Sequence, residues 1–216
     1  MQNIRYHFID LLRFLAAITV SITHLTAQIK GPSLNFEIIS SMAVEIFFII
    51  SGFVLAPQII RLIKNNSFYN YKIFLIRRWY RTIPLYILSL LLTSIILGKL
   101  FSIDFLKYLL FIQNLLFLSI SNEYFSIAWS LSVEEWFYII FPLFLILILR
   151  NFSHDKNNYI VIGSIVFITI ITICRIYFSD LEQWGSNVRR IVIFRLDAIV
   201  YGFLLFIFIN KIHKNL

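Results

Sequence analysis

The chain has few charged residues, cysteines, prolines and glycines. Only 14% of its 216 residues are charged, and it contains one cysteine, four prolines and six glycines. One cysteine forms no disulfide within the chain and no zinc site, so Cys174 is expected to be a small buried residue. Soluble domains carry about a quarter charged residues. The scarcity of charge therefore excludes an ordinary soluble domain.

Apolar residues take the place of the missing charge. They make up 60% of the chain, and phenylalanine alone contributes 23 residues. A water-soluble core cannot bury so much apolar surface in a chain of this length, so lipid must solvate part of it. A spanning helix needs about 20 mostly apolar residues. The chain has about seven such stretches, over residues 8–28, 40–60, 82–97, 105–120, 128–149, 159–176 and 191–210.

These stretches predict an all-α fold, a polytopic bundle of about seven membrane segments. They are too long and too evenly apolar for the alternating strands of a barrel, so helices must satisfy the backbone in lipid. The third and fourth stretches are short, which is compatible with tilted or re-entrant segments. Asp10, Arg13 and His24 interrupt the first stretch, which is therefore not a cleaved signal peptide.

The distribution of the net charge of +8 predicts the orientation of the chain. Residues 61–81, between the second and third stretches, carry six basic and no acidic side chains. Short loops rich in lysine and arginine stay in the cytoplasm. This loop and the amino terminus are therefore expected inside the cell. Topology accounts for most of the basic residues, and nothing indicates nucleic-acid binding.

Ionisable residues inside the first segment are the first functional signal, because each costs roughly 2.5–3.5 kcal/mol on insertion. Arg13 and His24 are eleven residues apart, so a helix returns them to nearly the same face. Asp10 lies one turn before Arg13 and can pair with it. The polar stripe either joins helices or serves chemistry, and a neutral imidazole can accept a proton from a hydroxyl.

Further polar residues occur in the later segments. Ser51-Gly52 permits close approach of two backbones, whereas Ser51 has no neighbouring base that would make it a nucleophile. Arg78 and Arg81 lie on one helical face at the membrane surface. They are either topology anchors or phosphate-binding groups, since guanidinium binds phosphate through paired hydrogen bonds.

Two acidic residues are adjacent in the fifth segment. Glu134 and Glu135 point about 100° apart on a helix, so they cannot both serve one small site directly. At least one of them should meet a cation, for which Arg13, Arg175 and Arg195 are available. In the seventh segment, Arg195 and Asp197 face different directions, so each is expected to pair with another helix.

Five motifs together resemble the acyltransferase family 3 of membrane proteins, which contains O-acetylases of surface glycans such as lipopolysaccharide and peptidoglycan. They occur in the family's order and are DLLR (10–13) followed by His24, FFIISGF (47–53), RWYRTIP (78–84), SLSVEEWFY (130–138) and RLDAIVYG (195–202). The chain departs from the family at Leu11 and Phe14, where glycine is common. Family members usually have ten or more membrane helices, so residues 1–216 resemble a single acyltransferase-like domain that lacks the last helices.

The resemblance implies transfer of an acyl group, with acetyl as the expected group, from acyl-CoA to a hydroxyl of a surface glycan or lipid-linked sugar. It implies a catalytic set of His24, Arg13, Glu134 and Glu135, with His24 as the base. Arg78 and Arg81 would bind the phosphates of coenzyme A, and no metal is expected. The supporting residues are Asp10, Ser51, Gly52, Arg195 and Asp197.

The family also implies a location in the bacterial plasma membrane. A transporter or flippase would carry intramembrane charges equally well, although the two similar halves with broken helices that favour a transporter are not visible in the sequence. An inactive truncated subunit is a third reading. Transfer of label from acetyl-CoA distinguishes an enzyme from a transporter.

Overall fold

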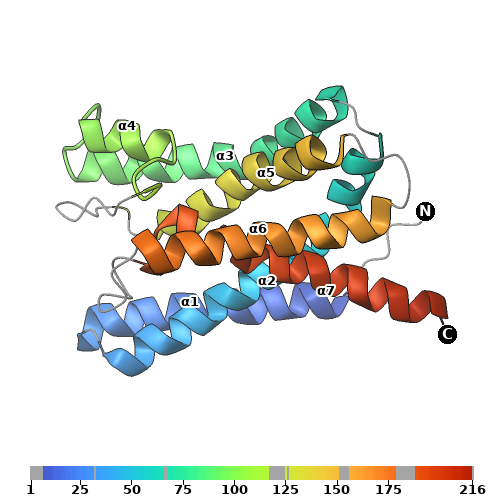
Figure 1. Cartoon of the computed structure of the whole chain (residues 1–216). Coiled ribbons are helices and arrows are strands. Elements are labelled where there is room, and N and C mark those ends of the chain that lie inside the picture. The colour runs from blue at the N-terminus through green and yellow to red at the C-terminus, as the bar shows by residue number, and fades with distance from the viewer. Residues whose placement is uncertain are drawn as a thin grey trace. The chain divides into compact units, whose positions relative to one another are not determined.

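The structure, a computed structural model, describes residues 7–31, 33–65, 68–116, 125, 127–150, 156–178 and 188–215. Within these ranges every regular element is a helix, which confirms the predicted all-α fold class. The elements are α1 (His7–Lys30), α2 (Leu34–Asn65), α3 (Phe68–Ile96), α4 (Ile103–Leu109), α5 (Ala128–Leu149), α6 (Lys156–Phe178), the 3₁₀ turn η3 (Val192–Phe194) and α7 (Leu196–Asn215) (Figure 1).

In the part of the chain that the structure describes, six helices are long and apolar enough to cross a membrane. Large apolar side chains remain exposed along them, among them Phe14 on α1, Leu88 on α3 and Ile165 on α6. A soluble protein rarely exposes so much apolar surface, whereas lipid solvates it. The chain is therefore a membrane protein. Helix α5 has the bounds that the sequence predicts, and α1, α2 and α6 extend beyond their apolar stretches at both ends. Helix α3 begins earlier than its predicted stretch, and α7 begins and ends later.

The fourth predicted segment, 105–120, is not a spanning helix in its described part. Helix α4 ends at Leu109, and the following residues, to 116, are not helical. Phe111 takes a left-handed conformation with φ of 57°, which is costly for a residue with a side chain. Gln113 and Asn114 are buried and hydrogen-bonded to other parts of the chain. These polar contacts replace the helix, so residues 105–116 do not form one continuous helix.

The basic stretch 61–81 is also helical rather than a loop over its described residues. Helix α2 continues to Asn65, and α3 begins at Phe68. Lysine and arginine are good helix formers, and their long stems allow a helix to continue past its apolar stretch while the charge reaches water. The basic side chains therefore stand on the ends of two helices.

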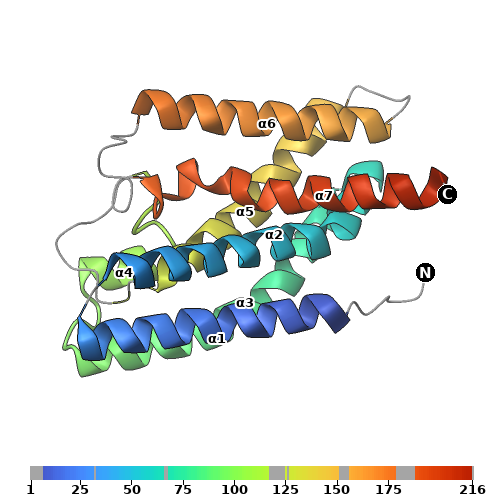
Figure 2. The same ribbon diagram turned by 90° about the horizontal axis from the view of Figure 1, so that it is seen from below.

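The chain forms two compact units. The first unit comprises the chain to Ala56 and the part from Ala198 onward. In it α2 and α7 cross at two glycines (Figure 2). A Cβ on Gly52 would overlap the carbonyl oxygen of Ile199, and one on Gly202 would overlap that of Ile49. This reciprocal contact confirms the predicted close approach at Gly52, which is the small-residue packing typical of membrane helices.

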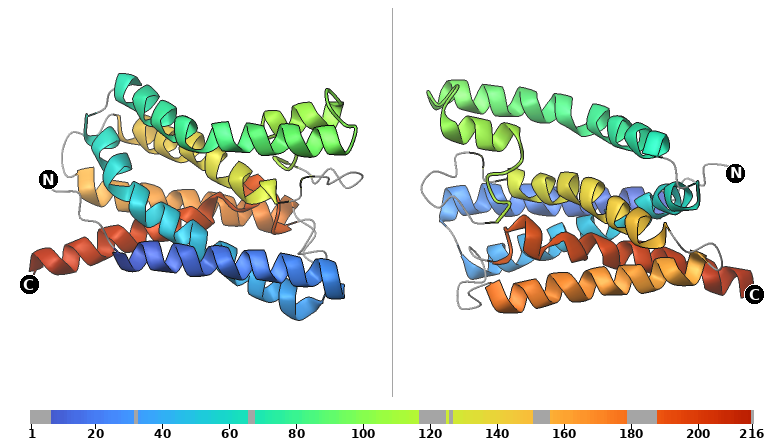
Figure 3. Two further views of the ribbon diagram at one scale, coloured as in Figure 1. Left: turned by 180° about the vertical axis from the view of Figure 1, so that it is seen from behind. Right: turned by 45° about the horizontal axis from the view of Figure 1, so that its top comes forward.

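The second unit, Pro57–Asp197, packs α3 against α4 and α5 against α6, while η3 contacts both α5 and α6 (Figure 3). Helix α5 contains Pro142, which lacks an N–H and weakens the helix hydrogen bonds of the preceding turn. The hydroxyl of Tyr71 on α3 donates to the carbonyl of Ile139 in that turn, at 2.9 Å. A neighbouring helix thus satisfies backbone near the proline, as a dry environment requires.

Candidate active site

Helix α1 carries the predicted base and its companions. Its buried residues are the small Ala16 and Thr23, seven positions apart on one face. His24 is exposed, and Arg13 is partly buried. Among the described residues, Asp10 and Arg13 form no ion pair, so the predicted pairing of these two does not form. No other described residue engages the imidazole of His24 either.

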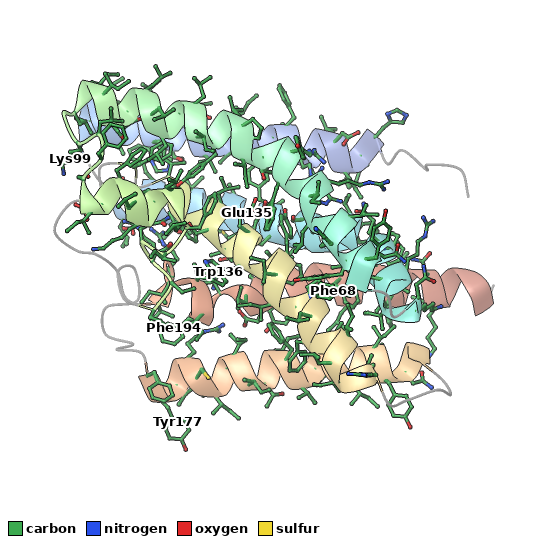
Figure 4. All side chains as sticks on the ribbon, turned by 90° about the horizontal axis from the view of Figure 1, so that it is seen from above. Phe68, Lys99, Glu135, Trp136, Tyr177 and Phe194 are labelled. Atoms are coloured by element: carbon green, nitrogen blue, oxygen red, sulfur yellow. The ribbon has the colours of Figure 1, made fainter. Side chains whose placement is uncertain are left out.

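Glu135 on α5 is the most deeply buried acid of the predicted catalytic set, with 3% of its surface exposed (Figure 4). Its Oε1 accepts a hydrogen bond of 2.7 Å from the hydroxyl of Thr82 on α3. Its Oε2 is buried and has no hydrogen-bond partner among the described residues. Trp79 lies near the carboxyl without hydrogen-bond geometry to Oε2. A carboxyl with one free acceptor is costly in the interior, which marks it as a functional candidate.

Glu134 and Glu135 have different surroundings, in line with their predicted divergence. Glu134 is only partly buried, and its Oε2 accepts a hydrogen bond of 3.1 Å from Tyr138 one turn later on α5. The charged groups that act on Glu135 are Arg78 of α3 and Glu134 itself. Arg78 is therefore a cation that acts on Glu135, and it is not among the three arginines considered from the sequence.

Arg78 and Arg81, the predicted phosphate-binding pair, differ in exposure. Arg78 is partly buried, and its Nη2 donates to Oε1 of Gln58 on α2 at 2.7 Å. Its guanidinium also lies 6.0 Å from the ring centroid of Phe74, within cation–π range. Arg81, one turn later, is exposed. Arg78 is therefore held in place by its neighbours, while Arg81 is available to a ligand.

Two non-helical segments of the second unit are joined by hydrogen bonds. The backbone N–H of Val192 donates to the carbonyl of Asn114 at 2.9 Å, and that of Ile193 donates to Leu115 at 3.3 Å. The side chain of Asn114 donates to the carbonyl of Arg190 at 2.5 Å. The indole of Trp136 on α5 donates to the carbonyl of Phe111 at 2.9 Å. These contacts satisfy unwound backbone inside the protein, the condition under which membrane proteins tolerate it.

Polar side chains follow one face of α5 from this unwound segment toward α3. Gln113 donates to the hydroxyl of Ser132 at 2.6 Å. Ser132 and Glu135 are three residues apart, so they are neighbours on the helix surface. From Glu135 the path continues to Thr82. We call this set the α5 polar line, and its members are Gln113, Ser132, Glu135, Thr82, Arg78 and Gln58.

An ion pair holds the start of α7. Nη2 of Arg175 on α6 donates to Oδ2 of Asp197 at 2.6 Å, and the same guanidinium donates to the carbonyl of Phe194 at 2.6 and 3.0 Å. Asp197 therefore pairs with another helix, as predicted. Arg195 is also buried, with 7% of its surface exposed. The ion pair therefore fixes the turn that precedes α7, which gives Asp197 a structural role.

The predicted site residues fall into the two units. His24, Arg13, Asp10, Ser51 and Gly52 belong to the first, and Glu134, Glu135, Arg78, Arg81, Arg195 and Asp197 belong to the second. Within the second unit, the charge of Arg78 acts on the carboxyl of Glu135. Across the ranges that the structure describes, no group of three histidine, cysteine, aspartate or glutamate side chains is arranged to hold a metal ion.

Sequence reasoning missed four members of the α5 polar line, namely Gln58, Thr82, Gln113 and Ser132. Gln113 could have been predicted, because it and Asn114 are two adjacent amide side chains in an apolar stretch, and unpaired amides are costly in lipid. Thr82 could not, because a threonine in a membrane helix usually bonds to its own backbone.

Comparison of the sequence with known proteins finds one matching family. The profile of a family described as an acyltransferase domain matches residues 6–215. An uncharacterised protein of Haemophilus influenzae is 33% identical over 190 residues, which cover 79% of this chain and 76% of that protein. A peptidoglycan O-acetyltransferase of Listeria monocytogenes is 31% identical over 186 residues, which cover 76% of this chain.

The two relatives differ in how much of them is matched. The aligned part makes up only 28% of the Listeria protein, so the chain corresponds to a minor part of that relative. No solved structure matches the chain at a significant level.

Proposed function

This chain belongs to the family described as the acyltransferase domain, and we propose from this premise that it is an integral membrane O-acyltransferase. The proposed donor is an acyl-CoA, with acetyl as the acyl group. The proposed acceptor is a hydroxyl of a surface glycan or of a lipid-linked sugar. The acceptor class is supported by the name of the Listeria relative, a peptidoglycan O-acetyltransferase. The proposed location is the bacterial plasma membrane.

The observation that carries the proposal is the group formed by Arg78, Thr82 and Glu135. Arg78, on the basic part of α3, contacts Gln58 and Phe74. The buried carboxyl of Glu135 on α5 accepts a hydrogen bond from Thr82 on α3. Anion binding and proton handling are thereby adjacent within otherwise apolar helices. Acyl transfer from acyl-CoA needs both functions, because the donor carries phosphate groups and the reaction moves protons. Packing of helices needs neither.

The proposed reaction assigns a role to each predicted residue. His24 removes the proton of the acceptor hydroxyl as that oxygen attacks the thioester carbonyl. A fixed positive charge stabilises the oxyanion of the tetrahedral intermediate, a role proposed for Arg13. Arg78 and Arg81 bind the phosphates of coenzyme A. Glu134 and Glu135 belong to the catalytic set on the donor side.

Donor binding is tested by exchanging the guanidinium for an ammonium group. Arg78→Lys keeps the charge but loses the paired hydrogen bonds, and a charged hydrogen bond contributes about 1.5–3 kcal/mol. We expect the KM for acetyl-CoA to rise roughly tenfold or more, with insertion unchanged. Steady-state kinetics in vesicles measures the effect, and Arg77→Lys, an exposed neighbour, is the matched control. An unchanged KM in both Arg78→Lys and Arg81→Lys would leave the pair as topology anchors.

Orientation is tested with a cysteine at Asn65, the exposed last residue of α2. In a Cys174→Ser background, this cysteine should resist a membrane-impermeant thiol reagent in intact cells, because the basic residues around it keep the helix end in the cytoplasm. Permeabilised cells should show full labelling, which proves that the position is reactive. Ready labelling in intact cells would place these arginines outside and remove the donor argument.

The function itself is tested by transfer of label. Purified chain in lipid vesicles is incubated with radiolabelled acetyl-CoA and extracted surface glycans, and protein-free vesicles serve as the control. An acyltransferase leaves label on the glycan, and mild alkali releases it if the new bond is an ester to oxygen. Movement of unmodified label or glycan into the vesicles without transfer would support a transporter and contradict the proposal.

A further inference from the structure

The hydroxyl of Thr82 has two hydrogen-bond acceptors but one hydrogen. Its oxygen lies 2.7 Å from Oε1 of Glu135 and 3.2 Å from the carbonyl oxygen of Arg78, one turn earlier on α3. A hydroxyl donates one hydrogen and accepts through two lone pairs. It therefore cannot donate to both oxygens at once. Which of the two it serves depends on where the proton of the carboxyl is.

The two charge states of Glu135 each fit one arrangement. If Glu135 is a carboxylate, Thr82 donates to Oε1, and the Arg78 carbonyl keeps only its helical partner. If Glu135 carries a proton on Oε1, it donates to the Thr82 oxygen, and the Thr82 hydrogen turns to the Arg78 carbonyl. The oxygen atoms need not move between the two arrangements. A partner that only donates, such as lysine or arginine, would fit the carboxylate alone.

We propose that Thr82 is a positioning residue that lets Glu135 hold and release a proton on the donor side of the site. The proposal rests on the proposed acyl transfer and adds the source of the proton that the leaving thiolate of coenzyme A takes up. When the thioester C–S bond breaks, the leaving thiolate of coenzyme A takes the proton from Oε1 of Glu135. The Thr82 hydrogen then turns from the Arg78 carbonyl to the carboxylate.

The proton balance closes over one turnover. The proton of the acceptor hydroxyl passes to His24, and the proton of Glu135 passes to the thiol of coenzyme A. Before the next cycle His24 releases its proton to water and Glu135 takes one from water, so no net proton is gained or lost. The charged groups that act on Glu135 are Arg78 on α3 and Glu134 on α5. Arg78 is also the proposed phosphate contact, so the same arginine acts on the donor and on Glu135.

Infrared spectroscopy tests the inference without relying on activity. The carbonyl band of a protonated carboxyl is recorded for the chain in vesicles over a range of pH, and the difference from Glu135→Gln isolates Glu135. Thr82→Val has the same shape without the hydroxyl, so it should shift this band to higher frequency. Thr82→Ser should restore the wild-type frequency. A band that is absent at every pH, or unchanged in Thr82→Val, overturns the proposal.

Transfer kinetics give the second readout. Thr82→Val should lose roughly tenfold or more in transfer rate and should change its pH profile, since positioned proton transfer contributes about 10²–10⁴-fold. Thr82→Ser should stay near the wild-type rate, because serine keeps the hydroxyl that bonds to Glu135. The control is Thr93→Val on the same helix, whose hydroxyl donates only to the carbonyl of Ser89. Equal losses in Thr82→Val and Thr82→Ser contradict the proposal, whereas a wild type without any transfer contradicts the function and leaves the infrared result readable.

Discussion

Replacing His24 by alanine should lower the rate of acyl transfer by at least about a hundredfold, because a general base contributes roughly 10²–10⁴-fold. The imidazole is exposed on α1, and no other residue in the described ranges engages it. Expression and thermal stability should therefore stay near wild type. The measurement is transfer of label from acetyl-CoA in vesicles, with donor binding assayed separately.

Glutamine at position 24 separates chemistry from structure. His24→Gln keeps polarity and hydrogen bonding but cannot accept the proton, so it should fail almost as badly as alanine. The matched control is His7→Gln, at the exposed start of the same helix, which should transfer at the wild-type rate. Near-normal transfer by His24→Gln would show that the histidine is structural. If the chain alone is inactive, the pair of variants is made in a longer family member.

Replacing Asp197 by alanine should cost about 3–5 kcal/mol of stability, the second large effect. Removal of one partner of a buried ion pair leaves the other charge without compensation. Here the side chain of Asp197 is 3% exposed and that of Arg175 is 17% exposed, with 2.6 Å between Nη2 and Oδ2. Thermal unfolding in detergent should show the loss, and the folded yield should fall.

The chain supplies its own control for this effect. Asp104 and Lys107 on α4 form a more exposed ion pair of 3.7 Å, with side chains 25% and 39% exposed. Such surface pairs contribute about 0–1 kcal/mol, so Asp104→Ala should change stability little. If Asp197→Ala lowers the stability no more than Asp104→Ala does, the ion pair between Arg175 and Asp197 does not stabilise the fold.

The features that were predictable from sequence are those set by a local pattern. The apolar stretch of α5 gives its bounds directly, because lipid leaves the helix as the only way to satisfy the backbone. Gly52 predicted a close helix contact, which Ile199 provides. Asp197 predicted a partner on another helix, since an unpaired acid is too costly at that depth.

The features that were not predictable depend on contacts distant in sequence. The unwound segment after α4 is held by the hydrogen bond from Asn114 to the carbonyl of Arg190. No pattern within residues 105–120 could have predicted that partner. Thr82 reaches Glu135 across 53 residues instead of bonding only to its own helix. Hydropathy alone also places the basic ends of α2 and α3 in a loop, because it does not register that lysine and arginine continue a helix.

The joining of the segment 111–116 to residues 190–193 has a consequence for synthesis. Asn114 and its partner Arg190 are 76 residues apart. At about 5–20 residues per second, the ribosome takes about 4–15 seconds to produce that length of chain. For this interval the carbonyl groups of Asn114 and Leu115 lack the N–H groups of Val192 and Ile193 that bond to them in the folded chain, and lipid offers no substitute. The segment must therefore wait in contact with water or with the insertion machinery, and the second unit can close only after η3 has emerged.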